Sequence, residues 1–259
     1  MGQTKLGLPL EYKKLPEYFD AHNIWDDTDA KNTLIEKLLK SHKVQTVLDL
    51  TCGTGSQVFF LAKRGYHATG ADFSPELLKQ ARDKALREKI DVKFIDGDMR
   101  TLRVGRFDAV ITIFNAVGHL TKAGFEKTMR NINRNLKDGG IYVFDILNLE
   151  AMTETVVNDL AMDFHKTVNN TQIHNVQYSE INKENGRLTS YDSYNIQTGT
   201  NKPKKFRHKF SLQIYAAKEL KEMLFINGFD TIEQYGFDGL EFSRHKSLTI
   251  LTIARKILS

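Results

Sequence analysis

Short apolar runs alternate with amphipathic segments through the N-terminal part of the chain. Such runs are typical of parallel strands that are covered on both faces. The pattern predicts strands over residues 47–50, 67–72, 92–95, 109–114 and 141–146, and helices within 15–39 and over 57–63 and 122–136. We expect the helix over 122–136 to end at residues 137–140, where a basic residue is followed by glycines that terminate a helix. Strictly alternating strands and helices require a parallel sheet with helices on both faces, so the predicted fold class is α/β.

The pattern changes after Asn148. A helix is predicted over 149–160, and segments 174–181 and 187–194 then alternate with a period of two around an Asn-Gly turn, which predicts a hairpin. A third run, 206–215, completes an antiparallel insert of about three strands. A helix over 217–227 precedes two closing strands at 231–235 and 247–254. We expect a single domain, 1–259, made of N-terminal helices (1–40), a core (41–148), a helix with the insert (149–215) and a closing region (216–259).

Composition fits a globular enzyme. The chain has 259 residues, 41% hydrophobic content and one cysteine, which excludes an internal disulfide and a cysteine metal cluster. We expect no metal site, no membrane-spanning segment and no secretion signal, and therefore a cytoplasmic protein. The net charge of +5 raises the possibility of nucleic-acid binding, above all at the basic run 202–209. We favour a solvated turn for this run, so nucleic acid is not the expected partner.

A glycine turn after the first predicted strand marks a ligand site. The sequence from Asp49 to Gly55 reads D-x-x-x-G-x-G, and both glycines allow a tight turn and a close approach of ligand to backbone. A dinucleotide fingerprint needs a third glycine, but Val58 occupies that position and no P-loop lysine follows. An ordinary strand–helix turn is the alternative interpretation.

Acidic residues follow the next two predicted strands. Asp72 ends the second strand, from which a carboxylate can accept hydrogen bonds from both hydroxyls of a ribose. Asp98 follows the third strand and is a candidate acceptor for an adenine amine, with Met99 packing on the ring. Each carboxylate alone is more often a solvated strand end. Their arrangement beside the glycine turn favours an adenosine ligand.

At these motifs the chain resembles the class I S-adenosylmethionine-dependent methyltransferases, over roughly residues 15–256. It is most similar to small-molecule N-methyltransferases of the aminosugar and glycine/sarcosine types, which carry such an insert, and it resembles the aminosugar type through Gly97–Arg100 and Gly118–Leu120. The resemblance implies a doubly wound, mostly parallel seven-stranded Rossmann-like sheet, with an antiparallel insert after the fifth strand that covers the substrate. It also implies S-adenosylmethionine as cofactor and S-adenosylhomocysteine as product. The Asn-Pro-Pro-Tyr motif of enzymes that methylate base amines is absent.

The resemblance also implies site residues. The expected cofactor-binding residues are Thr51, Cys52, Gly53, Gly55, Asp72, Phe73, Asp98, Met99 and Asn115. His119 is the candidate catalytic residue, either as a base or as a group that orients the acceptor, with a packed structural histidine as the alternative. We interpret Cys52 as a small thiol packed in the turn rather than as a nucleophile.

Candidate substrate contacts are Tyr18, His22, Trp25, Tyr191 and Arg207. Relatives often carry tyrosines where this chain has Phe19 and Asn23, so no catalytic tyrosine is assigned there. The predicted reaction is methyl transfer to a nitrogen or oxygen of a small molecule. An RNA or protein methyltransferase and a non-catalytic cofactor-binding module are the alternatives. The sequence leaves the acceptor and the oligomeric state open.

Overall fold

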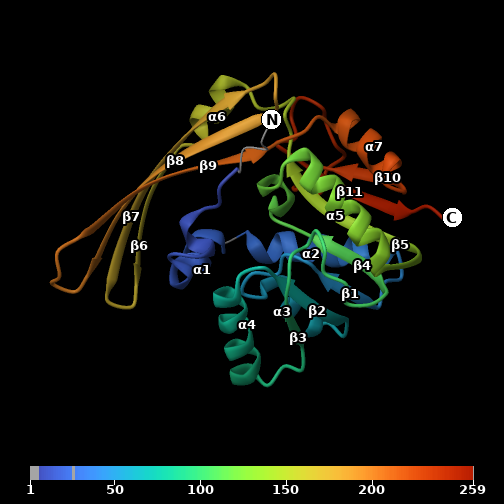
Figure 1. Ribbon diagram of the computed structural model, residues 1–259, viewed down its shortest axis with the longest axis horizontal. Coiled ribbons are helices and arrows are strands. Elements are labelled where there is room, and N and C mark those ends of the chain that lie inside the picture. Colours follow the sequence, from blue (N-terminus) through green and yellow to red (C-terminus); the bar gives the residue numbers. More distant parts are fainter. Residues whose placement is uncertain (1–5, 25–26, 259) are drawn as a thin grey trace.

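The computed structural model describes residues 6–24 and 27–258, which form two β-sheets with helices (Figure 1). The helices are α1 (Phe19–Asn23), α2 (Thr28–Ser41), α3 (Ser56–Ala62), α4 (Pro75–Glu88), α5 (Lys122–Asn135), α6 (Glu154–Asp159) and α7 (Ala217–Ile226), with 3-10 turns η1 (Leu10–Tyr12), η2 (Pro16–Tyr18) and η3 (Ala116–His119). The strands of the large sheet are β1 (Thr46–Asp49), β2 (His67–Asp72), β3 (Lys93–Asp96), β4 (Phe107–Thr112), β5 (Leu136–Leu147), β10 (Phe229–Tyr235) and β11 (Thr249–Lys256).

The large sheet has the strand order β10-β11-β5-β4-β1-β2-β3. Strands β3, β2, β1, β4 and β5 pair in parallel, and β11 pairs antiparallel with both β5 and β10. The mostly parallel seven-stranded α/β sheet is therefore confirmed. Because the order reverses between β1 and β4, the carboxyl ends of these two strands flank a crevice at the edge of the sheet.

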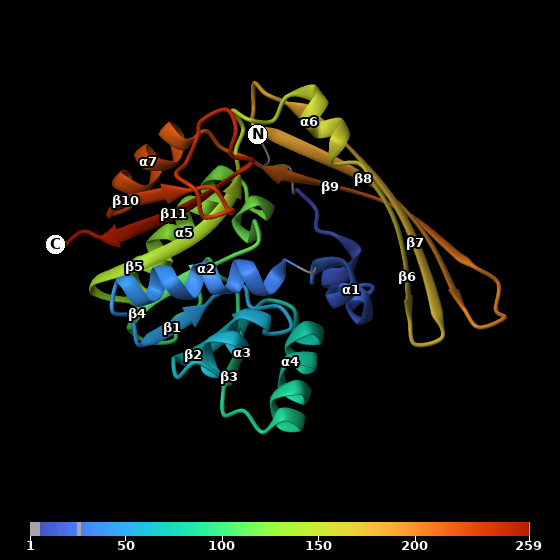
Figure 2. The same ribbon diagram turned by 180° about the vertical axis from the view of Figure 1, so that it is seen from behind.

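Helices cover both faces of this sheet (Figures 1 and 2). Leu39 of α2, Phe59 of α3 and Ala81 of α4 belong to the apolar core on one face. Phe125 of α5 and Leu224 of α7 belong to the core on the other face. Burial on both sides explains why these strands read as continuous apolar runs rather than as alternating ones.

The insert forms a separate antiparallel sheet in the order β6-β7-β8-β9. Its strands are β6 (Met162–Val168), β7 (Thr171–Asn182), β8 (Arg187–Thr198) and β9 (Lys204–Gln213). The sequence predicted about three strands, so β6 was missed. The alternating apolar residues of β6 and the asparagine in the turn to β7 were signals present in the sequence. In the structure, Asn169 adopts a left-handed φ of 53° in this turn.

The boundaries of a helix and of a strand also differ from the expectation in a way that has a local cause. Helix α6 covers only the second half of the predicted helix 149–160, because Thr153 caps it through its side chain. Strand β5 begins at Leu136, directly after α5, so residues 137–140 lie in the strand rather than in a helix stop. Within the described residues, no helix has the length and apolar character needed to cross a bilayer.

Candidate active site

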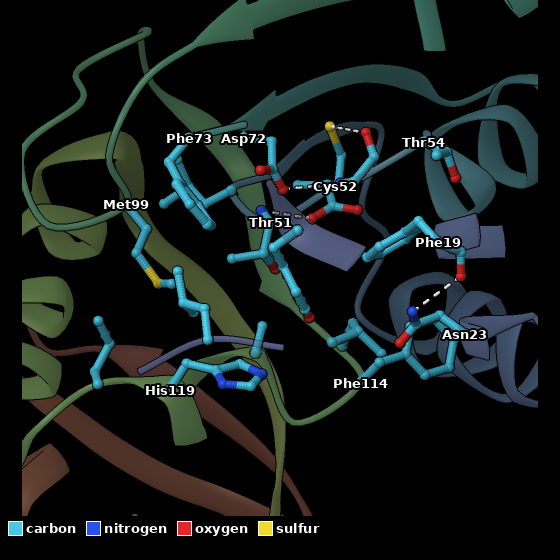
Figure 3. A pocket seen from close by; sticks show the side chains of 18 of the residues that line it. Phe19, Asn23, Thr51, Cys52, Thr54, Asp72, Phe73, Met99, Phe114 and His119 are labelled. Atoms are coloured by element: carbon cyan, nitrogen blue, oxygen red, sulfur yellow. Dashed lines mark hydrogen bonds between the residues drawn. The ribbon is translucent and has the colours of Figure 1, made fainter. Parts of the chain in front are cut away.

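A cavity of about 730 Å³ lies at the carboxyl ends of the central strands (Figure 3). Its floor comes from the ends of β1, β2 and β4, and its cover comes from the N-terminal residues and α1. The lining includes Leu6, Gly7, Leu8, Tyr12, Lys13, Phe19, Asn23, Asp49, Thr51, Cys52, Gly53, Thr54, Asp72, Phe73, Asp98, Met99, Arg100, Phe114, His119 and Leu120. Seven of the nine predicted cofactor residues thus share one cavity with His119.

The glycine turn is shaped for close contact. Gly53 has a φ of 52°, and a Cβ there would lie 3.0 Å from the Phe19 ring. Gly55 has a φ of 88° where α3 begins, and a Cβ there would lie 2.8 Å from the Phe59 ring and 2.9 Å from the Phe94 ring. Gly55 is not among the described lining residues, so its contribution is to let α3 start close to the sheet.

Cys52 lies in the same turn and is buried. Its backbone N–H donates to the Ala71 carbonyl at 3.0 Å, which joins the turn to the end of β2. Burial raises the pKa of the Cys52 thiol well above its usual range, and the nearby carboxylates raise it further. A thiol held in its protonated form is a poor nucleophile.

Two buried carboxylates face the cavity from β1 and β2. The Asp72 oxygens accept hydrogen bonds from the Gly53 and Ser74 N–H groups, both at 2.9 Å, so the glycine turn and the start of α4 fix this side chain. Asp49 accepts from the Thr51 N–H at 3.0 Å. Burial raises the pKa of Asp49 to about 7, opposed by the hydrogen bond from Thr51, and the Asp72 charge also raises it. Burial raises the pKa of Asp72 as well.

Met99 lies at the other end of the cavity from Asn23 and Phe19 (Figure 3), and Asp98, the preceding residue, also lines the cavity. The Asp98 carboxylate accepts from the Arg100 backbone N–H at 2.8 Å and from its guanidinium at 2.5 Å. These bonds lower the pKa of Asp98. Asn131 donates to the Met99 carbonyl at 3.0 Å and so anchors this loop on α5.

His119 ends η3 and its ring faces the cavity (Figure 3). The ring centroid lies 5.3 Å from that of Tyr12 and 6.2 Å from that of Phe210. Nδ1 is buried and has no hydrogen-bond partner among the described residues. Burial lowers the pKa of His119 to about 4, so the ring is neutral at physiological pH.

The turn after β4 is strained at two consecutive residues. Phe114 and Asn115 have φ values of 62° and 57°, a left-handed conformation that non-glycine residues adopt only under constraint. The Asn115 N–H donates to Asp145 at 3.0 Å, and its side-chain oxygen accepts from the Leu147 N–H at 3.1 Å. The Asn115 side chain therefore holds the turn to β5 and is not part of the described lining, whereas Phe114 faces the cavity.

Sequence analysis missed the N-terminal cover. Tyr12 stacks on Phe73 with ring centroids 6.2 Å apart and meets the Phe19 ring edge-on at 5.3 Å. The Leu6 carbonyl accepts from Ser211 on β9, and His208 contacts the Leu8 carbonyl at 2.6 Å, which anchors the cover to the insert. Tyr12 lies in a single 3-10 turn, where no hydrophobic periodicity could reveal it.

The structure does not bring three predicted substrate residues into the cavity. Tyr18 is buried in an apolar cluster with strand residues of the insert such as Ile173. Tyr191 stacks on Tyr178 at 4.8 Å, and Arg207 is exposed; neither is in the described lining. Strand alternation explains the positions of Tyr191 and Arg207, because the odd-numbered residues of β8 and β9 face away from the N-terminal segment. Trp25 and the side chain of His22 lie outside the described residues.

Comparisons with known proteins agree with this geometry. A family model described as a methyltransferase domain matches residues 47–140. An uncharacterized protein of Methanocaldococcus jannaschii is 26% identical over 238 residues, which cover 90% of this chain and 80% of that protein. The glycine/sarcosine N-methyltransferase of Parasynechococcus marenigrum is 30% identical over 173 residues, 59% of this chain and 60% of that enzyme. The chain thus matches less than two thirds of that enzyme's length.

The fold has solved counterparts. The sugar N-methyltransferase KedS8 from a Streptoalloteichus species superposes with a TM-score of 0.78 at 16% identity, over 100% of this chain and 98% of that one. The chain therefore has the Rossmann-like fold of class I methyltransferases. Residues 47–140 thus resemble a methyltransferase domain in sequence, and a solved structure of the same fold, an amino pentose methyltransferase from Micromonospora echinaspora at 17% identity, has S-adenosylmethionine bound.

Proposed function

We propose that this protein methylates an amine nitrogen of a small organic molecule. The observation that carries the proposal is the cavity of about 730 Å³, which lies within the size range of small-molecule sites. Residues of the segment 6–13 and of α1 partly cover it. The names of the glycine/sarcosine and sugar N-methyltransferases among the relatives support an amine acceptor.

The residues present fit the cofactor. S-adenosylmethionine supplies an electrophilic methyl group on a positively charged sulfur. Asp49 and Asp72 line the cavity and give it negative charge when they are ionised, and Gly53 removes a side chain where the ligand would lie against the backbone. We assign the ribose to Asp72, whose orientation is fixed by two backbone N–H groups, and the adenine to the Asp98–Met99 end.

His119 orients the acceptor in this proposal. With a pKa of about 4, its ring is too weak a base to remove a proton from an alkylammonium ion, whose pKa is close to that of lysine, about 10.4. A neutral imidazole nitrogen can accept a hydrogen bond from an amine N–H and so direct the nitrogen lone pair at the methyl group. The amine therefore reacts as the free base, after its proton has passed to water.

The test is a transfer assay with radiolabelled S-adenosylmethionine. Glycine, sarcosine and aminosugars would be compared with matched alcohols that carry hydroxyl in place of the amine. Methylation of at least one amine, and of none of the alcohols, is expected. Transfer to an alcohol alone would reject nitrogen as the acceptor.

RNA is the substrate that tests the alternative function of an RNA methyltransferase. The basic run Lys202–Lys209 lies around the β8–β9 turn, and none of its residues is in the described cavity lining. We therefore expect no transfer to RNA, and any RNA shift in a binding assay should vanish as salt is raised without transfer appearing. Salt-resistant methylation of RNA would overturn the small-molecule proposal.

A further inference from the structure

A compact group of metal-ligating side chains lies on the insert, outside the cavity. Asp163 and His165 belong to β6, and His174 belongs to β7 directly opposite His165. Their donor atoms, one from each residue, all lie within 4.8 Å of one another. The two imidazole rings stack with centroids 3.9 Å apart and an interplanar angle of 14°.

Both rings point the same nitrogen at one carboxylate oxygen. Nε2 of His174 lies 2.8 Å from Asp163 Oδ1, and Nε2 of His165 lies 3.2 Å from the same oxygen. Zinc–nitrogen and zinc–oxygen bonds of about 2.0–2.2 Å place neighbouring ligand atoms about 2.9 Å apart at right angles and about 3.4 Å apart at the tetrahedral angle. The two distances from the histidine nitrogens to the Asp163 oxygen therefore already match those along the edge of a coordination polyhedron, and all three donor atoms lie within 4.8 Å of one another.

The local backbone makes this arrangement stable without a metal. His165 and His174 are a direct cross-strand pair, and Asp163 is two residues along the same strand, so all three side chains leave the same face of the sheet. That face is the outer one, because Ile173 and Asn175 on the other face are buried. The donor atoms are thus open to ions from solvent.

A further acceptor lies beside the group. Asn195 of β8 pairs in register with His174, and its side-chain oxygen is buried without a hydrogen-bond partner among the described residues. Lys205 of β9 pairs with Asn195 in turn and is exposed. The side-chain oxygen of Asn195 is therefore a candidate partner for a water molecule bound to an ion at the three donor atoms.

We propose that Asp163, His165 and His174 form a binding site for one divalent transition-metal ion of the zinc type. Two imidazoles and one carboxylate suit Zn²⁺, Co²⁺ or Ni²⁺, whereas Ca²⁺ and Mg²⁺ prefer all-oxygen sites. Three protein ligands leave the remaining positions to water.

The bound ion would crosslink the edge strand β6 to β7, because it takes ligands from both strands. On the opposite face of β6, Lys166 contacts the Ala21 carbonyl of α1 at 3.4 Å, and α1 contributes to the cover of the cavity. The ion thus stabilises the hairpin that supports this cover. Its role is structural, because none of the three ligands lies in the described cavity lining.

The test uses the full-length protein without an affinity tag. Zinc chloride is titrated calorimetrically into wild type, His174→Ala, Asp163→Asn and, as matched control, His245→Ala, which removes an exposed histidine outside the group. One ion per chain is expected for wild type and control, and affinity weakened about tenfold or more for the two site variants. The absorption spectrum of the cobalt-loaded protein should differ from that of wild type in His174→Ala and Asp163→Asn, and it should match wild type in His245→Ala.

Two results would overturn the proposal. One is the absence of zinc binding at millimolar concentration. The other is equal zinc affinity in wild type and His174→Ala, which would mean that the ion binds elsewhere. Cofactor affinity, measured in parallel, should be unchanged in all variants and shows that they are folded.

Discussion

The charge of Asp49 should control cofactor binding. This carboxyl faces the cavity, and burial raises its pKa to about 7, so a large fraction is protonated and uncharged near neutral pH. S-adenosylmethionine brings a sulfonium and an ammonium group, which favour an ionised carboxylate nearby. We therefore expect the cofactor to bind the ionised form of Asp49 and to bind more tightly as the pH rises through 7.

The size of the effect follows from the pKa. With a pKa of about 7, about one tenth of the Asp49 side chains are ionised at pH 6 and about nine tenths at pH 8. If only the ionised form binds, the apparent dissociation constant at pH 6 is about tenfold that at pH 8, or about 1.4 kcal/mol. Asp49→Asn removes the titration, so its affinity should be weaker at pH 8 and nearly independent of pH.

Isothermal titration calorimetry at pH 6, 7 and 8 measures this dependence directly. Asp230→Asn is the matched control, since Asp230 is exposed on β10 and lies outside the described lining. It should keep the wild-type pH dependence. If wild type binds equally well at pH 6 and pH 8, or if Asp49→Asn titrates like wild type, then Asp49 does not interact with the positive charges of the cofactor.

Three other substitutions test separate parts of the site. His119→Ala should lower turnover about tenfold, because the hydrogen bond to the acceptor is lost, while cofactor affinity stays within twofold. Kinetics measures the turnover and calorimetry the affinity. An equal loss of cofactor affinity would mean that the ring contacts the cofactor instead. Tyr12→Ala should weaken cofactor binding by about tenfold because the ring packs on Phe73, and Tyr12→Phe should retain the affinity; identical affinities for both variants would contradict this. Arg207→Ala should leave the Michaelis constant of the acceptor unchanged, since its side chain is exposed outside the cavity lining; a marked rise would restore it as a substrate residue.

The amino-acid sequence alone determined the fold class and which residues from the strand ends line the cavity. Strands β1, β2 and β4 are buried on both faces, so their apolar runs were visible without any tertiary information. Asp72 and the glycine turn were equally visible, because local backbone geometry demands glycine there and an acidic residue directly after an apolar strand is a local feature of the sequence. These features depend on neighbours in sequence or on a general rule of parallel sheets.

Tertiary structure decided which side chains share the cavity. Tyr12 reaches it through an N-terminal segment that hydrogen-bonds to Ser74 and to β9, about 200 residues later in the chain. Tyr191 and Arg207 are excluded because a one-residue step along a strand turns a side chain to the opposite face. Likewise, the three ligands proposed for zinc meet only through the register of β6 and β7. Such contacts depend on long-range packing and strand register, which no local pattern in the chain encodes.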